Sequence, residues 1–479
     1  MCGFAGFVVT DALRATSDPQ RVAERMGDRI KHRGPDDAAY YIDERVALAF
    51  RRLSIIDLEG GRQPIESEDG SCVLVLNGEI YNYRELRAEL VKRGHVFKTH
   101  ADSEVVLHGF EEYGRAVLDR LRGMFAFVIW DKRNDVLFGA RDIFGIKPLY
   151  CYQRGGEFMF ASEIKSFLAH PRFLCELERA HIATYLSYEY IPNEQTLFKS
   201  VQKVLPAHWF EWDVRTKSFS TGCYYEMRYR VDERLTLDEW AQRIDEALSE
   251  SVAAHLVSDV EVGGFLSSGV DSSYLVERVL HAGGAEGAGA SGVGAAAAEG
   301  ASAVGAAGVG GAKAGGLRTF SVGYADERFS ELPAAQRLAR ELGVECVANT
   351  VSADEFFGAM PAIQYHMDEP LPNPSENPLY FLCENAARQV KVVLSGEGAD
   401  ELFGGYPNYS QECATAAYER CVPRFLRRLA GAAAGGLPSF KGQHFLVRGA
   451  VEPWQRNSRA NYVFEESECR RFLRSSAET

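Results

Sequence analysis

Short apolar runs that end in polar or glycine-rich turns fill much of the N-terminal half of the chain. Runs at 1–9, 72–76, 125–130 and 158–161 have the length of strands, and few segments between them show helical spacing. We therefore predict stacked sheets, with the first strand in the middle of its sheet. The mixed segment at 204–222 is interpreted as a connection between two domains.

The C-terminal half alternates helical patterns with short apolar runs. Strands are predicted at 260–266, 318–323, 344–347 and 391–395. Strands that alternate with helices in this way indicate a parallel sheet, which binds ligands at the carboxyl ends of its strands.

A long helix is predicted at 235–256 in front of this sheet. Five apolar residues recur there at helical spacing and are expected to face the core: Leu237, Trp240, Ile244, Leu248 and Val252. In contrast, the segment 281–316 is almost entirely alanine and glycine, so we predict a flexible surface loop there.

Length and composition limit the class of protein. A chain of 479 residues is long enough for two or three domains with their own cores, and a net charge of −14 argues against nucleic acid as the main partner. The ten cysteines include no Cys-x-x-Cys pair, so they indicate neither a disulfide framework nor a zinc site. No secretory signal and no apolar run of about 18 residues is found. We therefore expect a soluble cytoplasmic protein that does not contact membranes.

Cys2 is the first candidate for chemistry. Removal of Met1 would give this cysteine a free α-amine, and a nucleophile at the N-terminus can use that amine as its own base. The alternative is a small buried cysteine with a purely structural role.

Polar residues that follow strand-like runs are candidates to surround Cys2. Arg52 can pair with a substrate carboxylate, Asn77 and Gly78 can donate to an oxyanion, and Glu79 can receive an ammonium group. Asp102 stands before a predicted helix at 103–113 and has an ordinary helix-capping role as its alternative.

The run at 262–273 predicts a strand, a turn of small residues and a helix. Its glycines admit a close anion, its serines add hydroxyl donors, and the following helix presents its positive end. The candidate ligand-binding residues of this turn are Ser267, Gly269, Asp271, Ser272 and Ser273. The turn is not a Walker A loop, and a plain strand-to-helix connection is the alternative.

A second glycine-rich turn follows the predicted strand at 391–395. It places Glu397, Asp400 and Glu401 close together, which favours a bound cation such as Mg²⁺ carried by ATP. A solvated acidic turn is the alternative.

Several segments together resemble a known family. Met1-Cys2-Gly3, His32 to Asp36, Arg52 to Ser54, Asn77 to Asn82, Asp102, Gly123 to Phe127, Arg141 to Tyr150 and Ala161 to Lys165 resemble the class II glutamine amidotransferase domain, over roughly residues 2–205. With the turn at 262–273, the chain resembles glutamine-hydrolysing asparagine synthetase.

The resemblance implies an α+β N-terminal-nucleophile domain, an αββα sandwich, at 2–205. An α/β ATP-pyrophosphatase domain with a parallel sheet would follow at 225–479, interrupted by the loop at 281–316. The resemblance implies that ATP and Mg²⁺ are the cofactors and that glutamine and aspartate are the other substrates. It leaves open whether the protein forms a homodimer.

The resemblance also implies a role for each matching residue. Cys2 would attack glutamine, Asn77 and Gly78 would hold the oxyanion, Arg52 would bind the α-carboxylate, and Glu79 and Asp102 the α-ammonium group. Asp271 and Asp400 would bind Mg²⁺, and Glu397 would contact the reacting acyl group. The implied ATP-binding residues are Ser267, Gly269, Asp271, Ser272, Ser273, Ser321, Val322, Gly323, Ser395, Gly396 and Glu397.

The expected activity is glutamine-dependent asparagine synthesis, with an internal passage for ammonia. The segment 407–479 lacks the family's Glu-x-Arg-x-Pro-Phe-Leu-Asp pattern, so the chain departs from the family there. Two alternatives therefore stay open: the same chemistry on another carboxylate acceptor, or a glutaminase with a truncated, non-functional synthetase half.

Overall fold

The computed structural model describes residues 1–284, 316–326, 328, 330–370, 373, 375–458, 463–464 and 466–475. Apart from its ends, the predicted Ala/Gly loop at 281–316 lies outside the described residues. Residues 1–178, 192–370 and 374–394 form one compact unit, and residues 179–191, 371–373 and 395–479 form a second.

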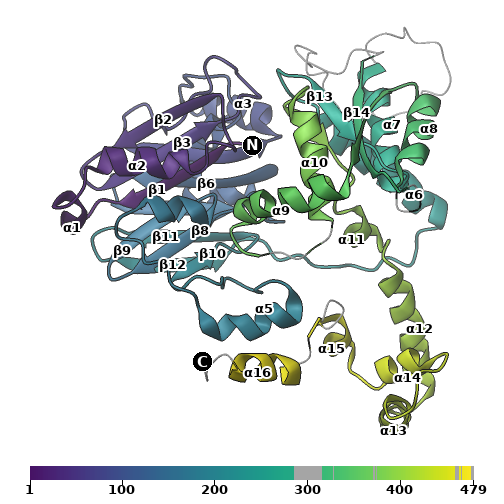
Figure 1. Ribbon diagram of the computed structural model, residues 1–479. Coiled ribbons are helices and arrows are strands. Elements are labelled where there is room, and N and C mark those ends of the chain that lie inside the picture. Colours follow the sequence, from purple (N-terminus) through teal and green to yellow (C-terminus); the bar gives the residue numbers. More distant parts are fainter. Residues whose placement is uncertain are drawn as a thin grey trace. The chain divides into compact units, whose positions relative to one another are not determined.

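Two antiparallel sheets of six strands dominate residues 1–225, all of which the structure describes (Figure 1). The first sheet has the order β10 (Val201–Lys203), β8 (Tyr150–Arg154), β9 (Glu157–Ala161), β1 (Gly3–Val8), β3 (Val46–Arg52) and β2 (Asp37–Ile42). The second has the order β12 (Ser218–Cys223), β11 (His208–Asp213), β7 (Val136–Arg141), β6 (Gly123–Asp131), β5 (Cys72–Ile80) and β4 (Ile65–Glu66).

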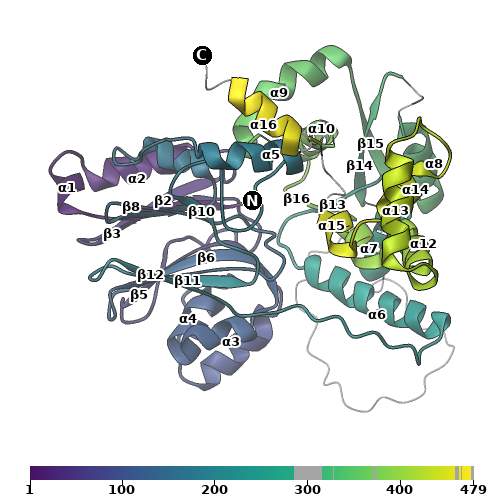
Figure 2. The ribbon, with the colours of Figure 1, turned by 90° about the horizontal axis from the view of Figure 1, so that it is seen from below.

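The two sheets stack face to face between helices, as Figure 2 shows. Successive strand residues point to opposite faces, so Phe4 and Phe50 fill the core between the sheets while Ala5 and Ala49 face α2 (Pro19–Asp28). On the far side of the second sheet, Leu74 and Leu76 pack with α3 (Tyr83–Lys92) and α4 (Glu104–Tyr113). This is the predicted αββα sandwich. Its short helices are α1 (Asp11–Arg14), η1 (Gly114–Asp119) and η2 (Ile164–Ala169).

The first strand has the central place that the sequence predicted. β1 pairs with β3 on one side, with Phe4 opposite Phe50, and with β9 on the other. The segment interpreted as a connection at 204–222 instead forms most of β11 and β12, beyond the domain boundary predicted at 205. In β11 the buried Phe210 and Trp212 alternate with Glu211 and Asp213, a pattern that the sequence interpretation overlooked; β11 pairs with β7, and β12 pairs with β11.

A parallel sheet of four strands follows within the same unit. Among the described residues its order is β15 (Glu345–Val351), β14 (Arg318–Tyr324), β13 (Val262–Phe265) and β16 (Val392–Leu394). Helices α6 (Leu237–His255), α7 (Val270–Gly284) and α8 (Leu332–Leu342) contribute to the core on one face, and α10 (Glu376–Ala387) packs on the other. Helix α9 (Ala353–Met367) precedes α10. The predicted parallel sheet is therefore confirmed.

The predicted long helix exists as α6, but its first turns do not face the core. Thr236 and Glu239 form a capping box that fixes its start. Val252 is buried, whereas Leu237 is 84% exposed and Trp240 is 38% exposed, so the prediction was wrong for these two residues. Periodicity identified the helix but not how far along its length the partner surface extends.

The second unit consists mainly of helices. They are η3 (Arg179–His181), α5 (Ile182–Tyr188), α11 (Ala399–Phe403), α12 (Pro407–Cys421), α13 (Arg424–Gly435), α14 (Gln443–Gly449), α15 (Pro453–Ser458) and α16 (Glu466–Ser475). Arg456 is 5% exposed and joins α15 to α12 through Glu412 and Glu419.

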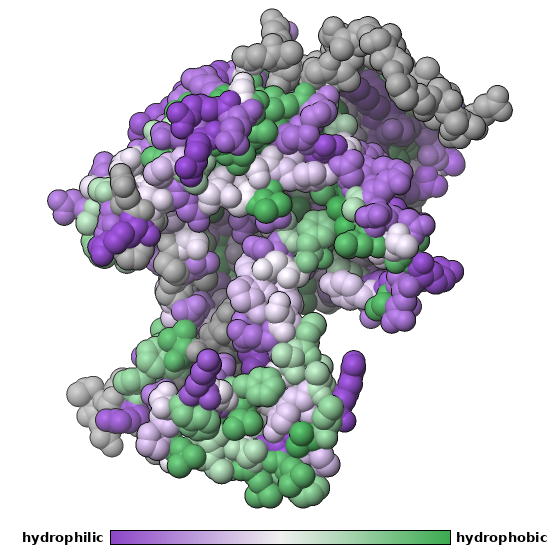
Figure 3. Space-filling view, turned by 90° about the vertical axis from the view of Figure 1, so that its right-hand side faces the viewer, coloured by the Kyte–Doolittle hydropathy of each residue, from purple (hydrophilic) through white to green (hydrophobic). Residues whose placement is uncertain are grey.

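Apolar side chains are exposed over the C-terminal helices of this unit (Figure 3). Phe425, Leu429 and Trp454 are each more than 60% exposed, with values of 63%, 64% and 69%. Contiguous apolar surface of this kind is unusual on a free protein surface. No helix among the described residues has both the length and the apolar character needed to cross a membrane.

Phe50→Ala should destabilise the sandwich, because this ring is 1% exposed between the two sheets. Removing a buried phenylalanine ring costs about 3–5 kcal/mol. Urea denaturation followed by the fluorescence of Trp130 and Trp212, which lie in the same core, would show a lower midpoint. Phe144→Ala is the control, because Phe144 is 54% exposed and its loss should change stability by less than about 0.5 kcal/mol. Equal midpoints for both variants would contradict the assignment of this core.

Candidate active site

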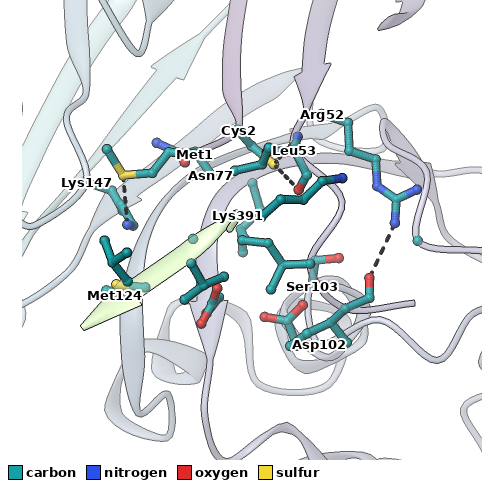
Figure 4. A pocket seen from close by; sticks show the side chains of 18 of the residues that line it. Met1, Cys2, Arg52, Leu53, Asn77, Asp102, Ser103, Met124, Lys147 and Lys391 are labelled. Atoms are coloured by element: carbon teal, nitrogen blue, oxygen red, sulfur yellow. Dashed lines mark hydrogen bonds between the residues drawn. The ribbon is translucent and has the colours of Figure 1, made fainter. Parts of the chain in front are cut away.

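A cavity of about 440 Å³ brings together all six residues predicted to form the glutamine site. Figure 4 shows it with Cys2, Arg52, Asn77 and Asp102 around the same space. The six lining residues are Cys2, Arg52, Asn77, Gly78, Glu79 and Asp102.

The ends of three strands place these side chains. Cys2 directly precedes β1, Arg52 is the last residue of β3, and Asn77 to Glu79 lie in β5. β5 runs against β6, with Gly78 opposite Phe125. A Cβ atom at position 78 would overlap the carbonyl oxygen of Met124, so the close approach of the two strands requires glycine there.

Backbone groups hold the Cys2 thiol. The Leu53 N–H donates to Cys2 Sγ at 3.3 Å, and the thiol faces Leu53 O at 3.5 Å. Arg33 Nε donates to Cys2 O at 2.9 Å. With the Asn77 amide oriented to satisfy both of its groups, Asn77 Nδ2 donates to Cys2 O at 3.0 Å and Oδ1 accepts from Arg33 Nη2 at 3.2 Å. Burial raises the pKa of the Cys2 thiol, and the Leu53 N–H opposes this rise.

Two buried carboxylates face the same cavity. Burial and the negative charge of Asp102 raise the pKa of Glu79 to about 7, although Lys147 opposes the rise. Burial raises the pKa of Asp102 to about 6, against the hydrogen bond that Asp102 Oδ2 accepts from Ile80 N at 2.7 Å. Neighbouring buried carboxylates favour a cation between them. The Lys147 ammonium, whose pKa burial lowers, instead donates to Met1 Sδ at 3.0 Å.

Arg52 carries a positive charge that no described carboxylate neutralises through an ion pair. Its guanidinium donates to the carbonyl oxygens of Leu58 at 3.0 Å, Ile56 at 3.3 Å and Asp57 at 2.5 Å. These neutral acceptors fix the plane of the group while leaving its charge for a ligand carboxylate.

Behind Cys2 lies an ion-pair network that the sequence did not reveal. Arg33 Nη1 lies 2.9 Å from Glu163 Oε1, and His32 Nε2 lies 3.0 Å from the same oxygen. Glu163 also pairs with Lys165, whose Nζ lies 2.9 Å from Asp368 Oδ1. Except for Asp368, these residues lie in the segments at 32–36 and 161–165 that resemble the family, and this resemblance marked them as candidates. Their pairing could not be predicted, because the partners are remote in sequence.

The cavity also contacts residues of the parallel-sheet region. Phe265 of β13 and Val392 and Val393 of β16 line it. Lys391 Nζ lies 2.6 Å from Asp36 Oδ2, and Asp57 N donates to Asp259 Oδ2 at 2.7 Å. The loop that positions Arg52 and Leu53 is therefore tied to the start of the parallel sheet.

The predicted phosphate turn lies between β13 and α7. Ser267 Oγ lies 2.9 Å from Ser272 Oγ and accepts from Gly269 N at 3.1 Å, while Ser273 Oγ donates to Gly269 O at 2.8 Å. The Glu331 carboxylate accepts from Ser268 N at 3.3 Å and Oγ at 2.8 Å. The turn thus already presents backbone and hydroxyl donors to an anionic group.

Other predicted ATP residues lie at the end of β14 and in the second unit. The Ser321 hydroxyl is buried and donates to Leu266 O at 2.6 Å, so its side chain supports the turn. Val322 and Gly323 follow Ser321 in β14. In the second unit, Glu397 N donates to Ser395 Oγ at 3.4 Å, next to Gly396, and Asp400 lies in the first turn of α11. Of the residues predicted to bind ATP and Mg²⁺, those at 267–273 and 321–323 therefore lie in the first unit, and those at 395–400 lie in the second.

Comparison with known proteins agrees with these observations. The model of a glutamine amidotransferase domain matches residues 1–225, and the model of asparagine synthase matches residues 243–475. The chain is 36% identical to asparagine synthetase [glutamine-hydrolyzing] 1 of Bacillus subtilis, over 99% of this chain and 70% of that protein. It is 36% identical to a putative asparagine synthetase of Mycobacterium tuberculosis, over 94% of this chain and 67% of that protein.

Asparagine synthetase B of Escherichia coli is 31% identical, over 85% of this chain and 65% of that protein. The N-terminal half is thus an N-terminal-nucleophile domain of the glutamine amidotransferase class. The whole chain belongs to the glutamine-hydrolysing asparagine synthetase family, which uses ATP and acts on small-molecule substrates.

Proposed function

We propose that the protein makes asparagine from aspartate with nitrogen taken from glutamine. The observation that carries the proposal is the single cavity in which Cys2, Arg52, Asn77, Gly78, Glu79 and Asp102 converge. Glutamine hydrolysis at Cys2 supplies ammonia, and ATP activates aspartate as an aspartyl adenylate. The products are asparagine, glutamate, AMP and pyrophosphate.

Glutamine binds through its two charged groups. The Arg52 guanidinium, held flat by backbone carbonyls, pairs with the α-carboxylate. Glu79 and Asp102 receive the α-ammonium group, which supplies the cation that two buried carboxylates favour. The side-chain amide of glutamine then points toward Cys2.

Removal of Met1 gives Cys2 the amine that serves as its base. Burial, with the charges of Arg33 and Lys147, lowers the pKa of the Met1 amine to about 6, although the coulombic effect of Cys2 opposes it. We expect the same surroundings to keep much of the Cys2 amine neutral and able to accept the thiol proton.

The thiolate attacks the amide carbon, and Asn77 Nδ2 and Gly78 N–H donate to the oxyanion that forms. The C–N bond then breaks, and ammonia leaves with the proton from the α-amine. Water hydrolyses the thioester to glutamate and restores the thiol.

The parallel-sheet region carries the ATP chemistry in this proposal. The turn at Ser267 to Ser273 binds the phosphates of ATP through donors such as the N–H and hydroxyl of Ser268, which in the structure donate to the Glu331 carboxylate. Asp271 and Asp400 offer carboxylate oxygens, the ligands that Mg²⁺ prefers, and the ion would neutralise charge on pyrophosphate when bound. The aspartate side-chain carboxylate attacks the α-phosphorus of ATP, and pyrophosphate leaves. Glu397 would contact the acyl group that ammonia attacks.

All ten cysteines have free thiols, which is typical of proteins in a reducing compartment. We therefore propose that the enzyme is cytoplasmic.

Cys2→Ala should separate the two activities. We expect glutamate formation to fall at least about a thousandfold, because the nucleophile is lost. Aspartate-dependent release of pyrophosphate from ATP should persist when ammonium replaces glutamine. Cys175→Ala, at an exposed cysteine far along the chain, is the matched control and should keep both activities.

The same assay decides between the open alternatives. Pyrophosphate release with another carboxylate but not with aspartate would replace the proposed acceptor. Glutamate formation without pyrophosphate release for any carboxylate would leave only the glutaminase.

The KM for glutamine should rise as the pH falls through about 7. Glu79 is ionised above its raised pKa, and below it a proton occupies the carboxylate that would hold the substrate ammonium group. The increase is limited to about tenfold per pH unit for one competing proton. Steady-state kinetics of the wild type and of Glu79→Gln would test this, because the variant should show a high KM and a flatter profile near neutrality. A wild-type KM that stays constant across this pH range would contradict the role of Glu79.

We also propose that ammonia reaches the synthetase side without passing through bulk solvent. The cavity at Cys2 extends to Phe265 and to Val392 and Val393, so its far wall is the parallel sheet. Neutral ammonia can cross such an apolar lining more readily than ammonium can.

Isotope competition tests this passage. With unlabelled glutamine and excess ¹⁵N-ammonium in the buffer, the asparagine formed should contain mainly unlabelled nitrogen. Cys2→Ala should incorporate the label fully. Free mixing of the two nitrogen sources in the wild type would rule the passage out.

A further inference from the structure

Four side chains with metal-binding atoms converge on the helical layer beside the second sheet. They are Glu68, between β4 and β5, His95, just after α3, and His108 and Glu111 on α4. One nitrogen or oxygen atom of each lies within 4.8 Å of those of the other three. None of the four belongs to the glutamine cavity.

The distances are close to those of a metal centre with four ligands. His108 Nδ1 lies 3.0 Å from Glu111 Oε2 and 3.6 Å from Glu68 Oε2. His95 Nδ1 lies 3.8 Å from Glu68 Oε1 and 4.0 Å from Glu111 Oε2. Nitrogen and oxygen ligands at about 2.0–2.2 Å from a tetrahedral Zn²⁺ are about 3.3–3.6 Å apart. Small side-chain movements would therefore complete such a site.

The second nitrogen of each imidazole also has a carboxylate neighbour. His108 Nε2 lies 3.4 Å from Glu104 Oε1, and His95 Nε2 lies 3.4 Å from Glu112 Oε2. Metal-binding histidines commonly donate their other N–H to a carboxylate, which fixes the tautomer and the ring orientation. Glu104 and Glu112 are not among the four converging groups, so their contacts with the imidazoles support a metal site independently.

Buried groups hold this arrangement rigidly. His108 and Glu104 are each 1% exposed. Glu104 also accepts from Lys98 N at 2.7 Å and from Thr99 N at 2.8 Å, so its carboxylate has a fixed place. The two converging carboxylates carry two negative charges, which match the charge of one divalent cation, and Glu104 and Glu112 add further negative charge around the imidazoles. Two arginines lie beside these carboxylates: Arg133 Nη2 is 3.7 Å from the other oxygen of Glu111, and Arg93 Nη1 is 2.8 Å from Glu112 Oε1.

We propose that Glu68, His95, His108 and Glu111 bind a divalent metal ion of the Zn²⁺ type. Imidazole ligands favour Zn²⁺ over Mg²⁺ or Ca²⁺, and this site is separate from any Mg²⁺ carried by ATP. The ion would clamp the segment between α3 and α4 to the turn after β4. Asp102 lies in that segment, so the metal would also steady one wall of the glutamine cavity without touching it.

The test measures metal bound by the full-length chain. After treatment with a chelator, wild type, His95→Gln, Glu68→Gln and His100→Gln are dialysed against equal low concentrations of Zn²⁺, and bound metal is determined by atomic spectrometry. His95 and Glu68 are not fully buried, so these variants should fold, and His100 is an exposed neighbour outside the cluster. Cysteines that bind Zn²⁺ affect all four proteins equally.

We expect wild type and His100→Gln to bind one more Zn²⁺ per chain than His95→Gln and Glu68→Gln. Zn²⁺ should raise the thermal midpoint of the first two proteins only. Co²⁺ in place of Zn²⁺ should give visible absorption bands of a four-coordinate site that are absent from the two cluster variants. Equal metal content and equal thermal shifts in all four proteins would overturn the proposal, and would mean that protonated histidines form ion pairs with these carboxylates instead.

Discussion

The buried carboxylate of Glu163 is the interaction on which the arrangement around Cys2 depends. Burial alone would raise its pKa, but the hydrogen bond from His32 and the charges of Arg33 and Lys165 outweigh burial and lower the pKa to about 2. Arg33 in turn holds Cys2 O, and Lys165 holds Asp368 at the end of α9. Removal of either cation would leave the buried Glu163 carboxylate with one positive partner fewer, which is more costly than the single pair is stabilising. Cys2 and the C-terminal end of α9 are thus positioned by one set of charges.

Much of the fold was predictable because apolar alternation reports which face of a strand is buried. Gly3 to Val8 is apolar throughout, and only a strand covered on both faces and paired on both edges accommodates such a run. The pattern failed where burial depends on distant partners. Leu237 and Trp240 have the same spacing as Val252, but the surface that would cover them is absent from the described residues around the first turns of α6. β11 was missed although Phe210 and Trp212 alternate with polar residues, whereas β12 shows little apolar alternation and is a strand because it pairs with β11.

The candidate site likewise contains residues that the sequence predicted and residues that it did not. Polar residues at the ends of predicted strands could be recognised as site candidates, because their position follows directly from local structure. They are Cys2, Arg52, Asn77 and Glu79. Lys147 and Glu163 were not assigned roles, because their partners are remote in sequence. The cluster at His108 shows the same limit: cysteine spacing indicated no zinc site, and its ligands come from segments that only the fold joins.

The place of Met1 has a consequence for the proposed mechanism, which requires a free α-amine on Cys2. Its sulfur contacts Lys147 in the cavity, and its amine is buried enough for the pKa to fall. Met1 lines the cavity, so a chain that keeps this residue fills part of the space in which we propose that glutamine binds. Trimming is easiest while the nascent chain is still extended, before β1 is enclosed between β3 and β9. Under the proposed mechanism, only chains from which Met1 has been removed carry the Cys2 amine that serves as the base, so the timing of this trimming would set the amount of active enzyme.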